Sequence, residues 1–302
     1  MKLTELLYPF AFLPVCLLLY YVLPKRCRNA ALLAASLLFF AWGTPEYLVL
    51  LVLAILLNYF AGLELESLLE DGKTGHARLI LVLTILADLL PLLFFKYYGE
   101  AAAALNRVFV LSLPVHALPA PVGVSFYTFT LLSALSDVYH GRAPMEKNLV
   151  RFALFVSFFP QLIQGPIARF DQLESQLVEP HRFDLDNIER GLLLMLWGLF
   201  KKKVIADRAL PLVEAVFGNQ SAYGGAIIVV GVLFYSLQQY ADFSGGIDLV
   251  TGIAQLFGIR LAPNFKRPYF SVSLGDFWRR WHISLGSWMR DYGFYPFALT
   301  RP

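Results

Sequence analysis

The chain has 302 residues, of which 58% are hydrophobic and only 16% charged, and its mean hydropathy is +0.59. Soluble domains usually carry about a quarter charged residues, so this composition excludes an ordinary soluble enzyme and indicates a polytopic membrane protein. The net charge of +3 is small and dispersed among short loops, which fits membrane topology better than binding to nucleic acid.

The N-terminal third predicts a first span and a helical hairpin. Residues 6–23 form an apolar run of the length that crosses the hydrocarbon core. The basic segment 24–28 follows directly, and the positive-inside rule places it in the cytoplasm. Residues 30–42 and 46–63 predict two helices broken at Gly43-Thr-Pro45, because proline and glycine end one helix and begin the next.

A polar loop is predicted over residues 64–77, followed by a crossing over residues 78–98. Asp88 lies inside that crossing, where an ionisable group is costly unless it faces other helices or water. We interpret Asp88 as the cap of a helix that restarts at Pro91, with a functional buried group as the alternative. Residues 101–121 contain three prolines and predict an interfacial segment.

The middle of the chain predicts an interrupted span. Residues 122–139 form a span whose serine and threonine residues allow close helix packing. Residues 149–170 begin another, but two prolines, a glycine and two glutamines interrupt it between Phe158 and Pro166. Since such backbone needs partners at membrane depth, we expect a bent or re-entrant segment that lines a pocket, with Gln164 among the lining groups.

A polar stretch at residues 171–189 precedes an apolar run, residues 191–200, that ends in Lys201-Lys-Lys203. Three lysines are able to hold lipid phosphates or the phosphates of a nucleotide-bearing donor. A plain cytoplasmic topology anchor is the interpretation that we prefer.

A second interruption is predicted where the span 226–240 runs into residues 238–248. Two glutamines, two aspartates and a Gly-Gly pair lie there in apolar surroundings, and they predict an unwound helix beside a polar cavity. Gln239 and Asp242 are its candidate lining groups.

The densest polar chemistry lies at residues 277–296, which hold three tryptophans, three arginines, an aspartate and a histidine. If residues 276–292 form one helix, four aromatic side chains share a face: Phe277, Trp281, Trp288 and Tyr292. Arg279 then lies beside His282. A neighbouring cation disfavours the protonated imidazole, and the neutral form is the one that accepts a proton from a hydroxyl.

This environment suits ester formation from an activated acyl donor. An alcohol needs its proton removed to become a good nucleophile, and water must be excluded so that it does not hydrolyse the donor. A buried His282 in an aromatic-lined pocket meets both needs, and the arginines are able to hold an anionic donor or acceptor. On composition alone, an interfacial helix with a tryptophan belt and snorkelling arginines remains the alternative.

The run Phe277-Trp-Arg-Arg-Trp-His-Ile-Ser-Leu285, continued by Trp288-Met-Arg-Asp-Tyr292, resembles the signature of the membrane-bound O-acyltransferase family. Its alginate O-acetyltransferase-like branch is the most similar. Further matching segments occur in the family's order along the chain: residues 121–127, 137–139, 159–166, 240–245 and 264–269.

The expected fold is a single all-α polytopic membrane domain over residues 1–302, with about eight to ten hydrophobic helices, several of them short, broken or re-entrant. The resemblance implies that these helices surround a central funnel or tunnel. It also implies a multi-pass protein of the bacterial cytoplasmic membrane, in contact with membrane lipids.

The implied activity is transfer of an acyl group, with acetyl as the expected group, from a thioester donor such as acetyl-coenzyme A. The acceptor is a cell-surface polysaccharide or an extracytoplasmic acyltransferase that relays the group. No tightly bound cofactor, metal or nucleic acid is implied.

His282 matches the first of two polar positions that the family associates with catalysis. The second, a histidine in a Leu-Trp-His-Gly run, does not occur in this sequence. We therefore expect a chain truncated before that segment, with His282 as one half of a catalytic pair or as its supporting partner. Weaker candidates for the substrate or donor channel are Trp278, Arg279, Arg280, Trp281, Ser284, Trp288, Arg290, Asp291, Gln164, Gln239, Asp242 and Asn264.

Two alternatives stay open at this point. One is a transporter or channel-like subunit, in which Asp88, Gln239 and Asp242 line a solute path. The other is a catalytically incomplete fragment.

Overall fold

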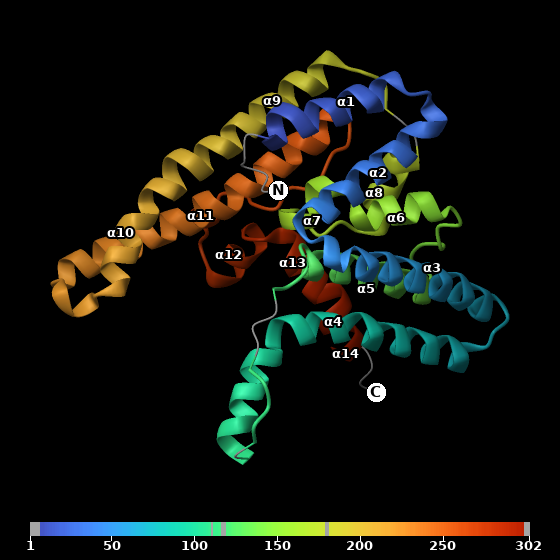
Figure 1. Ribbon diagram of the computed structural model, residues 1–302, viewed down its shortest axis with the longest axis horizontal. Helices are drawn as coiled ribbons and strands as arrows, with labels where there is room; N and C mark the ends of the chain where they lie inside the picture. The colour runs from blue at the N-terminus through green and yellow to red at the C-terminus, as the bar shows by residue number, and fades with distance from the viewer. Residues whose placement is uncertain (1–6, 110, 116–118, 179–180, 299–302) are drawn as a thin grey trace. The chain divides into compact units, whose positions relative to one another are not determined.

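The computed structural model describes residues 7–109, 111–115, 119–178 and 181–298, and within these residues every regular element is a helix (Figure 1). The predicted all-α class is confirmed. The chain divides into two compact units: the first is Met1–Ile163, Ile167–Pro180 and Asp291–Pro302, and the second is Gln164–Pro166 and His181–Arg290. The single membrane domain expected from the sequence stays a prediction.

The first unit contains the N-terminal helices and the last turns of the chain. Its elements are the π-helical turn η1 (Tyr8–Phe12), α1 (Leu13–Val22), α2 (Lys25–Gly43), η2 (Pro45–Tyr47), α3 (Leu48–Glu70), α4 (Thr74–Phe109), α5 (Val124–Tyr139), α6 (Leu149–Ser157), α7 (Phe159–Gln164), α8 (Phe170–Val178) and α14 (Tyr295–Ala298). The π-helical segment η6 (Met289–Phe294) leads into α14.

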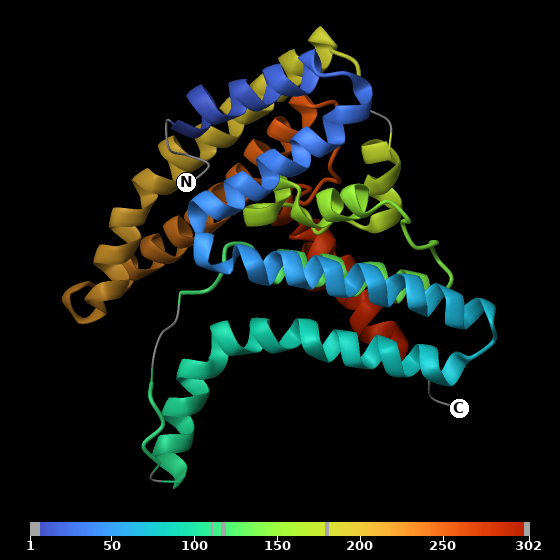
Figure 2. The same cartoon turned by 45° about the vertical axis from the view of Figure 1, so that its right-hand side comes forward.

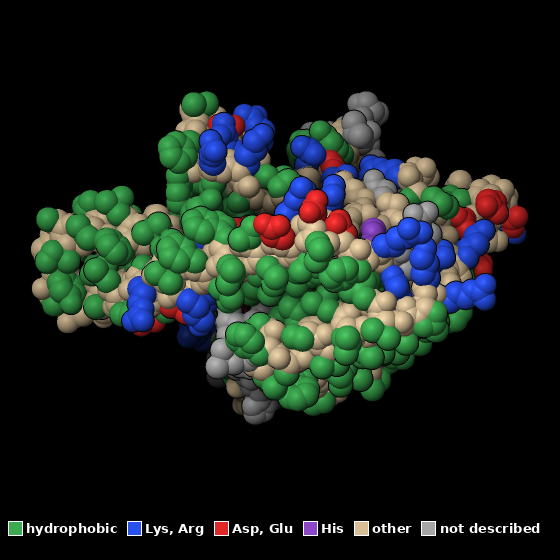
Figure 3. Space-filling view, turned by 90° about the horizontal axis from the view of Figure 1, so that it is seen from above, with side chains coloured by type: hydrophobic (Ala, Val, Ile, Leu, Met, Phe, Trp, Pro, Cys, Tyr) green, Lys and Arg blue, Asp and Glu red, His purple; other side chains and the backbone are tan. Residues whose placement is uncertain are grey.

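Three helices among the described residues are long and apolar enough to cross a membrane: Pro45–Glu70, Thr74–Phe109 and Gly225–Leu256. Their outer faces carry large exposed hydrocarbon side chains, such as Leu53, Leu83 and Leu233, at 57%, 56% and 64% exposure. The space-filling view shows wide hydrophobic areas with charged side chains gathered in groups (Figure 3). Apolar surface of this extent needs lipid or protein cover, which agrees with a multi-pass membrane protein.

The predicted break at Gly43-Thr-Pro45 is confirmed, because α2 ends at Gly43 and α3 begins at Leu48. The predicted polar loop over residues 64–77 is wrong. Helix α3 continues to Glu70, and only a short turn with Gly72 at φ +73° separates it from α4. Glu64, Glu66 and Glu70 therefore lie in α3. Glu66 also accepts a hydrogen bond from the Met145 amide at 2.9 Å.

Asp88 does not cap a new helix, because α4 runs without interruption through Pro91. The side chain of Asp88 is instead buried, and its Oδ1 accepts a hydrogen bond from Asn58 Nδ2 at 2.8 Å. Figure 2 shows that α4 is bent along its length, and Pro91 lies inside this helix. The predicted interfacial segment 101–121 is helical as far as Phe109, and part of it lies outside the described residues.

The predicted interruption between residues 158 and 166 is confirmed. Helix α6 ends at Ser157, α7 covers only Phe159–Gln164, and Phe158 between them leaves helical geometry. Two side chains satisfy the backbone groups at the break: Ser36 Oγ accepts from the Phe159 amide at 3.2 Å, and Gln161 Nε2 donates to the Phe155 carbonyl at 3.2 Å. These bonds explain why the break is tolerated in apolar surroundings.

The second unit is built on two long antiparallel helical rods (Figures 1 and 2). One rod joins α9 (Leu185–Phe200), the π-helical turn η3 (Lys201–Ala206) and α10 (Asp207–Gly218), and the other is α11 (Gly225–Leu256). A short turn, η4 (Gln220–Ala222), connects them, and η5 (Pro268–Phe270), α12 (Leu274–Arg280) and α13 (Ile283–Trp288) follow.

Glycines allow the two rods to approach closely. A Cβ atom added at Gly198 would lie 2.6 Å from the Gly245 carbonyl oxygen, and one added at Gly252 would lie 2.6 Å from the Gly191 carbonyl oxygen. Each rod therefore carries two glycines seven residues apart, on the same face of its helix. Small residues of this kind are typical of helix interfaces in membranes.

The predicted unwinding over residues 238–248 is wrong, because α11 is continuous there. The glycines serve packing instead. A Cβ atom at Gly246 would meet the Gln164 side chain at 2.4 Å, while Gly245 faces Gly198. The polar stretch 171–189 is also more ordered than expected, since α8 and the start of α9 cover part of it.

The close crossing predicts that Gly198→Ala destabilises the protein. The new methyl group would overlap backbone atoms of α11 that cannot move aside, at a cost of about 1–3 kcal/mol. The measurement is the midpoint of thermal unfolding in detergent, followed by size-exclusion chromatography.

Gly225→Ala is the matched control, because a Cβ atom there meets nothing within 4 Å. Equal midpoints for the two variants would contradict the assigned crossing.

Candidate functional site

His282 lies at a sharp break between two short helices. Helix α12 ends at Arg280, Trp281 is extended, and His282 adopts the left-handed conformation with φ +46° and ψ +55° before α13 begins. The expectation of one helix over residues 276–292 is therefore wrong. A left-handed residue other than glycine costs about 1–2 kcal/mol, and such strain is typical of functional sites.

Two backbone hydrogen bonds hold this break. The Lys266 amide donates to the Arg280 carbonyl at 2.9 Å, and the Ile283 amide donates to the Asn264 carbonyl at 3.0 Å. The segment that follows α11 thus fixes the turn that presents His282.

The carboxamide of Asn264 is the hub of the site. Its Oδ1 accepts from the Ser284 amide and the Ser284 hydroxyl, both at 2.9 Å, and lies 3.3 Å from His282 Nδ1. The backbone amide of Ser284 can only donate, which fixes Oδ1 on this side of the carboxamide. His282 therefore carries its proton on Nδ1, and the lone pair of Nε2 is left to accept a proton.

Burial keeps the imidazole neutral. The Phe243 ring packs edge-on against His282 with centroids 4.8 Å apart. Because His282 lies outside the three candidate spans but is half-buried in protein, desolvation lowers its pKa to about 4. Arg279, expected to be the cause, is 74% exposed and faces Asp276.

An aromatic cluster surrounds the turn. Phe277 stacks on Trp281 with centroids 5.6 Å apart, and Phe265 meets Trp281 edge-on at 5.1 Å. Tyr240 and Tyr269 complete the cluster around Trp281, at 6.1 Å and 6.3 Å. The first half of the predicted aromatic face is present, but the break at His282 removes the helical register that would have extended it to Trp288 and Tyr292.

A pocket of about 480 Å³ lies beside this site within the second unit. Asn264 belongs both to the pocket wall and to the hydrogen-bonded hub of His282. Polar and charged side chains from η3, α11 and the following loop line it: Lys201, Ser244, Asp248, Lys266 and Arg267.

Lys201, the first residue of the lysine cluster, is part of this wall, and the interpretation of the cluster as a topology anchor stays a prediction. Lys201 is 8% exposed, and its Nζ lies 2.7 Å from an Asp248 carboxylate oxygen and 3.0 Å from Ser244 Oγ. The neighbouring Lys202 pairs with Asp242. The sequence placed Asp242 and Asp248 beside an unwound helix. Both instead lie on the continuous helix α11, where they pair with Lys202 and Lys201.

The remaining predicted site residues of the second unit lie at its surface or in its packing. Arg279 and Arg280 both pair with Asp276, at 3.7 Å and 2.9 Å. Trp278 and Arg290 are exposed, Trp288 is half-buried, Gln164 packs against Gly246, and Gln239 donates to the Tyr235 hydroxyl at 3.1 Å.

Asp291 belongs to the first unit, where it pairs with Arg169. Next to it, the Tyr292 hydroxyl donates to Asp137 Oδ2 at 2.8 Å. The guanidinium groups of Arg142 and Arg169 lie 5.8 Å and 5.9 Å from the Tyr292 ring centroid. This cluster joins residues that are more than 120 positions apart in the sequence.

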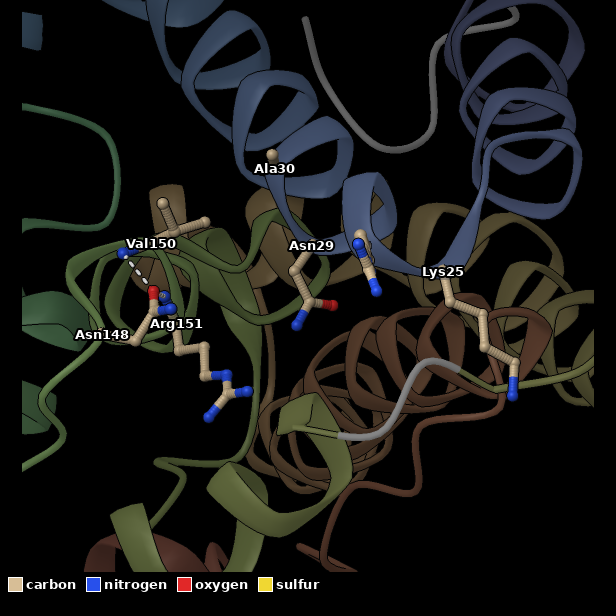
Figure 4. Close-up of a pocket in the computed structure, with 7 residues that line it drawn as sticks. Lys25, Asn29, Ala30, Asn148, Val150 and Arg151 are labelled. Atoms are coloured by element: carbon tan, nitrogen blue, oxygen red, sulfur yellow. Dashed lines mark hydrogen bonds between the residues drawn. The ribbon is translucent and has the colours of Figure 1, made fainter.

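The first unit also has a basic surface pocket of about 350 Å³ (Figure 4). Lys25, Arg26 and Arg151 bring positive charge to it, and Asn148 caps α6 at its edge by accepting from the Val150 amide at 3.0 Å. Arg151 lies 3.8 Å from Glu146, which offsets part of that charge.

Sequence reasoning missed two contributors to the site, Ser244 and Phe243, and it preferred a topology anchor to a site role for Lys201. Two signals could have placed Ser244 and Lys201 at the site. Ser244 and Asp248 are four residues apart in an apolar helix, so they share a face, and the glycines of α9 and α11 repeat with the same spacing of seven. No local signal links Phe243 to His282, because they meet only in the folded chain.

The model of the membrane-bound O-acyltransferase family matches residues 37–301. The chain is 40% identical over 288 residues to a probable alginate O-acetylase of Azotobacter vinelandii, covering 94% of this chain and 57% of the relative. It is 33% identical over 326 residues to a peptidoglycan O-acetyltransferase of Helicobacter pylori, covering 98% of this chain and 61% of the relative.

A teichoic acid D-alanyltransferase of Bacillus subtilis is 28% identical over 191 residues, covering 61% of this chain and 47% of the relative. The chain therefore spans less than two thirds of the length of these relatives.

Burial of neutral His282 predicts that acid destabilises the protein. The unfolded histidine takes up a proton near pH 6.5, whereas the folded one does so only near pH 4. Between these values the unfolded state binds more protons, so the free energy of unfolding falls as the pH is lowered through this window. The stabilising contribution of neutral His282 is complete above the window. The measurement is the unfolding midpoint between pH 7.5 and pH 4.5.

His282→Gln is the reference, since glutamine does not titrate. The wild-type midpoint should fall more steeply than that of the variant, and parallel curves would rule out this contribution.

Proposed function

The chain belongs to the membrane-bound O-acyltransferase family, and on this basis we propose that it acts as an integral membrane O-acyltransferase, with acetyl as the group transferred. The donor is a thioester such as acetyl-coenzyme A, used as a substrate. The acceptor is a cell-surface polysaccharide or an extracytoplasmic acyltransferase that relays the group. The relatives named for alginate and peptidoglycan acetylation support an acceptor of this class.

One observation carries the proposal: His282 is neutral, holds its proton on Nδ1, and lies against a residue that lines a polar pocket. In the proposed reaction, the acceptor hydroxyl gives its proton to Nε2 as its oxygen attacks the thioester carbonyl carbon. The new C–O bond forms, the C–S bond breaks, and the sulfur leaves as a thiolate that regains a proton from the imidazolium.

Asn264 supports this role in two ways. Its Oδ1 accepts from Nδ1–H, so it orients the ring and stabilises the imidazolium that forms. Its Nδ2 is buried and has no hydrogen-bond partner in the described part of the chain. A donor of this kind is suited to the negative charge that develops on a thioester oxygen.

The pocket beside Asn264 is suited to an anionic donor. Lys266 and Arg267 add two positive charges to its wall, while Lys201 is balanced by Asp248. Phosphate groups, as in a coenzyme A thioester, would be held by such side chains. We place the protein in the bacterial cytoplasmic membrane, as a single membrane domain around a funnel or tunnel.

The family's second histidine has no counterpart in these 302 residues. His282 is therefore proposed as the base, or as a group that supports a second catalytic residue. The transporter alternative loses part of its support, because the unwound segment that would have placed Gln239 and Asp242 beside a solute path is a continuous part of α11. For Asp88 that alternative stays a prediction.

Replacement of His282 by alanine is expected to reduce acetyl transfer by about 10²- to 10⁴-fold, the usual contribution of a positioned acid or base. The assay uses membranes from cells that express the complete gene product, radiolabelled acetyl-coenzyme A, and the polysaccharide fraction of the same cells. Protein amounts are equalised by immunoblotting.

His140→Ala is the matched control, since His140 is exposed and, among the described residues, its Nδ1 contacts the Ser136 carbonyl at 2.8 Å and the Ser136 hydroxyl at 3.4 Å, one helical turn away. Transfer that survives in His282→Ala would refute the assigned role of His282. No transfer by the wild-type membranes with any acyl thioester would refute the proposed activity.

A further inference from the structure

A second polar site lies inside the first unit, among the helices α3, α4 and α5. Asp88 is 5% exposed, Asn58 is fully buried and Tyr127 is 3% exposed. Asn58 and Asp88 belong to the two adjacent membrane-spanning helices α3 and α4, about ten and fourteen residues from their first residues, which is near the middle of a bilayer at 1.5 Å per residue.

Helix packing alone does not account for these three groups. The hydrogen bond from Asn58 Nδ2 to Asp88 Oδ1, at 2.8 Å, links α3 to α4. It leaves Asp88 Oδ2, Asn58 Oδ1 and the Tyr127 hydroxyl buried and without hydrogen-bond partners in the described residues. Each such atom costs roughly 1–3 kcal/mol, and leucine at position 88 would avoid that cost.

Asp88 and Tyr127 line a pocket of about 260 Å³. The rest of its wall is hydrocarbon: Leu50, Leu53, Ala54 and Leu57 of α3, and Ala87 and Pro91 of α4. Leu53 and Leu57 of the pocket wall are 57% and 44% exposed on a helix that is long and apolar enough to cross a membrane, so this side of the pocket is suited to contact with lipid.

The chemistry of the wall selects the ligand. Water molecules each need two to four polar partners, and Asp88 and Tyr127 are the two polar residues in a pocket wall that is otherwise hydrocarbon. A carboxylate would meet the acidic Asp88, and an ammonium ion would have to give up its hydration at the middle of the bilayer before it could pair there. A hydroxyl both donates and accepts, so it is able to donate to Asp88 Oδ2 and to accept from Tyr127.

We propose that this pocket binds the hydroxyl end of a neutral membrane alcohol, with its hydrocarbon body lying against the leucines of α3. This site is independent of the acyl-transfer site and lies in the other compact unit. A ligand of this class would link α4 to α5 by satisfying two of the buried polar atoms at once, Asp88 Oδ2 and the Tyr127 hydroxyl.

The test is photolabelling of the full-length protein in lipid nanodiscs. The probe is hexadecanol with a photoreactive diazirine near its hydroxyl end, and labelled peptides are located by mass spectrometry. Labelling is expected in the segments 50–57 and 87–91, and an excess of plain hexadecanol should compete for it while hexadecane should not. Equal competition by hexadecane, or labelling elsewhere only, would overturn the proposal.

Two variants make the test specific. Tyr127→Phe keeps the ring and removes one hydrogen bond, which should weaken labelling by about five-fold, and Asp88→Leu should weaken it further. Thr84→Val is the control, because the Thr84 hydroxyl is buried one turn away in α4 and donates to its own helix at Ile80.

Should Asp88→Leu fail to fold, Tyr127→Phe decides alone. Unchanged labelling in a folded Tyr127→Phe variant would overturn the proposal, as would stronger labelling by the matched hexadecylamine probe than by the alcohol.

Discussion

The candidate site depends on one oxygen atom, Oδ1 of Asn264. It receives the Ser284 amide, the Ser284 hydroxyl and His282 Nδ1, so it ties the loop after α11 to the start of α13. Because Asn264 is 1% exposed, water cannot replace these bonds at low cost. The tautomer of His282 and the free lone pair of Nε2 follow from this acceptor. Together with the two backbone hydrogen bonds at the break, it holds the left-handed turn in place.

Close packing of α9 on α11 supplies the other half of the site. Glycines at the crossing let the backbones approach, and this proximity brings Lys201 of η3 against Ser244 and Asp248 of α11. A buried lysine is costly without a carboxylate partner. The polar wall of the pocket therefore exists because small residues removed the side chains that would have kept these helices apart.

Part of this arrangement was predictable from the sequence. Composition established the membrane class, and prolines located the breaks after Gly43 and around Phe158. Proline lacks the backbone amide proton that a helix needs, so its effect depends little on the rest of the fold. The Gly-Gly pair in α11 led to a wrong prediction of unwinding, because glycine can either break a helix or allow close helix packing. Only the partner helix, which the sequence does not identify, distinguishes these two roles. His282 was found through its motif. Its neutral state was attributed to Arg279, whereas the structure shows burial against Phe243, a contact that forms only in the folded chain. The contact of Tyr292 with Asp137 is of the same kind, because the two residues are far apart in the sequence.

The break between α6 and α7 has a mechanical consequence. A proline or glycine break with unsatisfied backbone would behave as a hinge, able to bend at little cost. Here Ser36 Oγ accepts from the Phe159 amide and Gln161 Nε2 donates to the Phe155 carbonyl, so a motion that separates either pair of atoms has to break a buried hydrogen bond. The joint should therefore be stiffer than an unsupported break, and Ser36 ties α7 to α2.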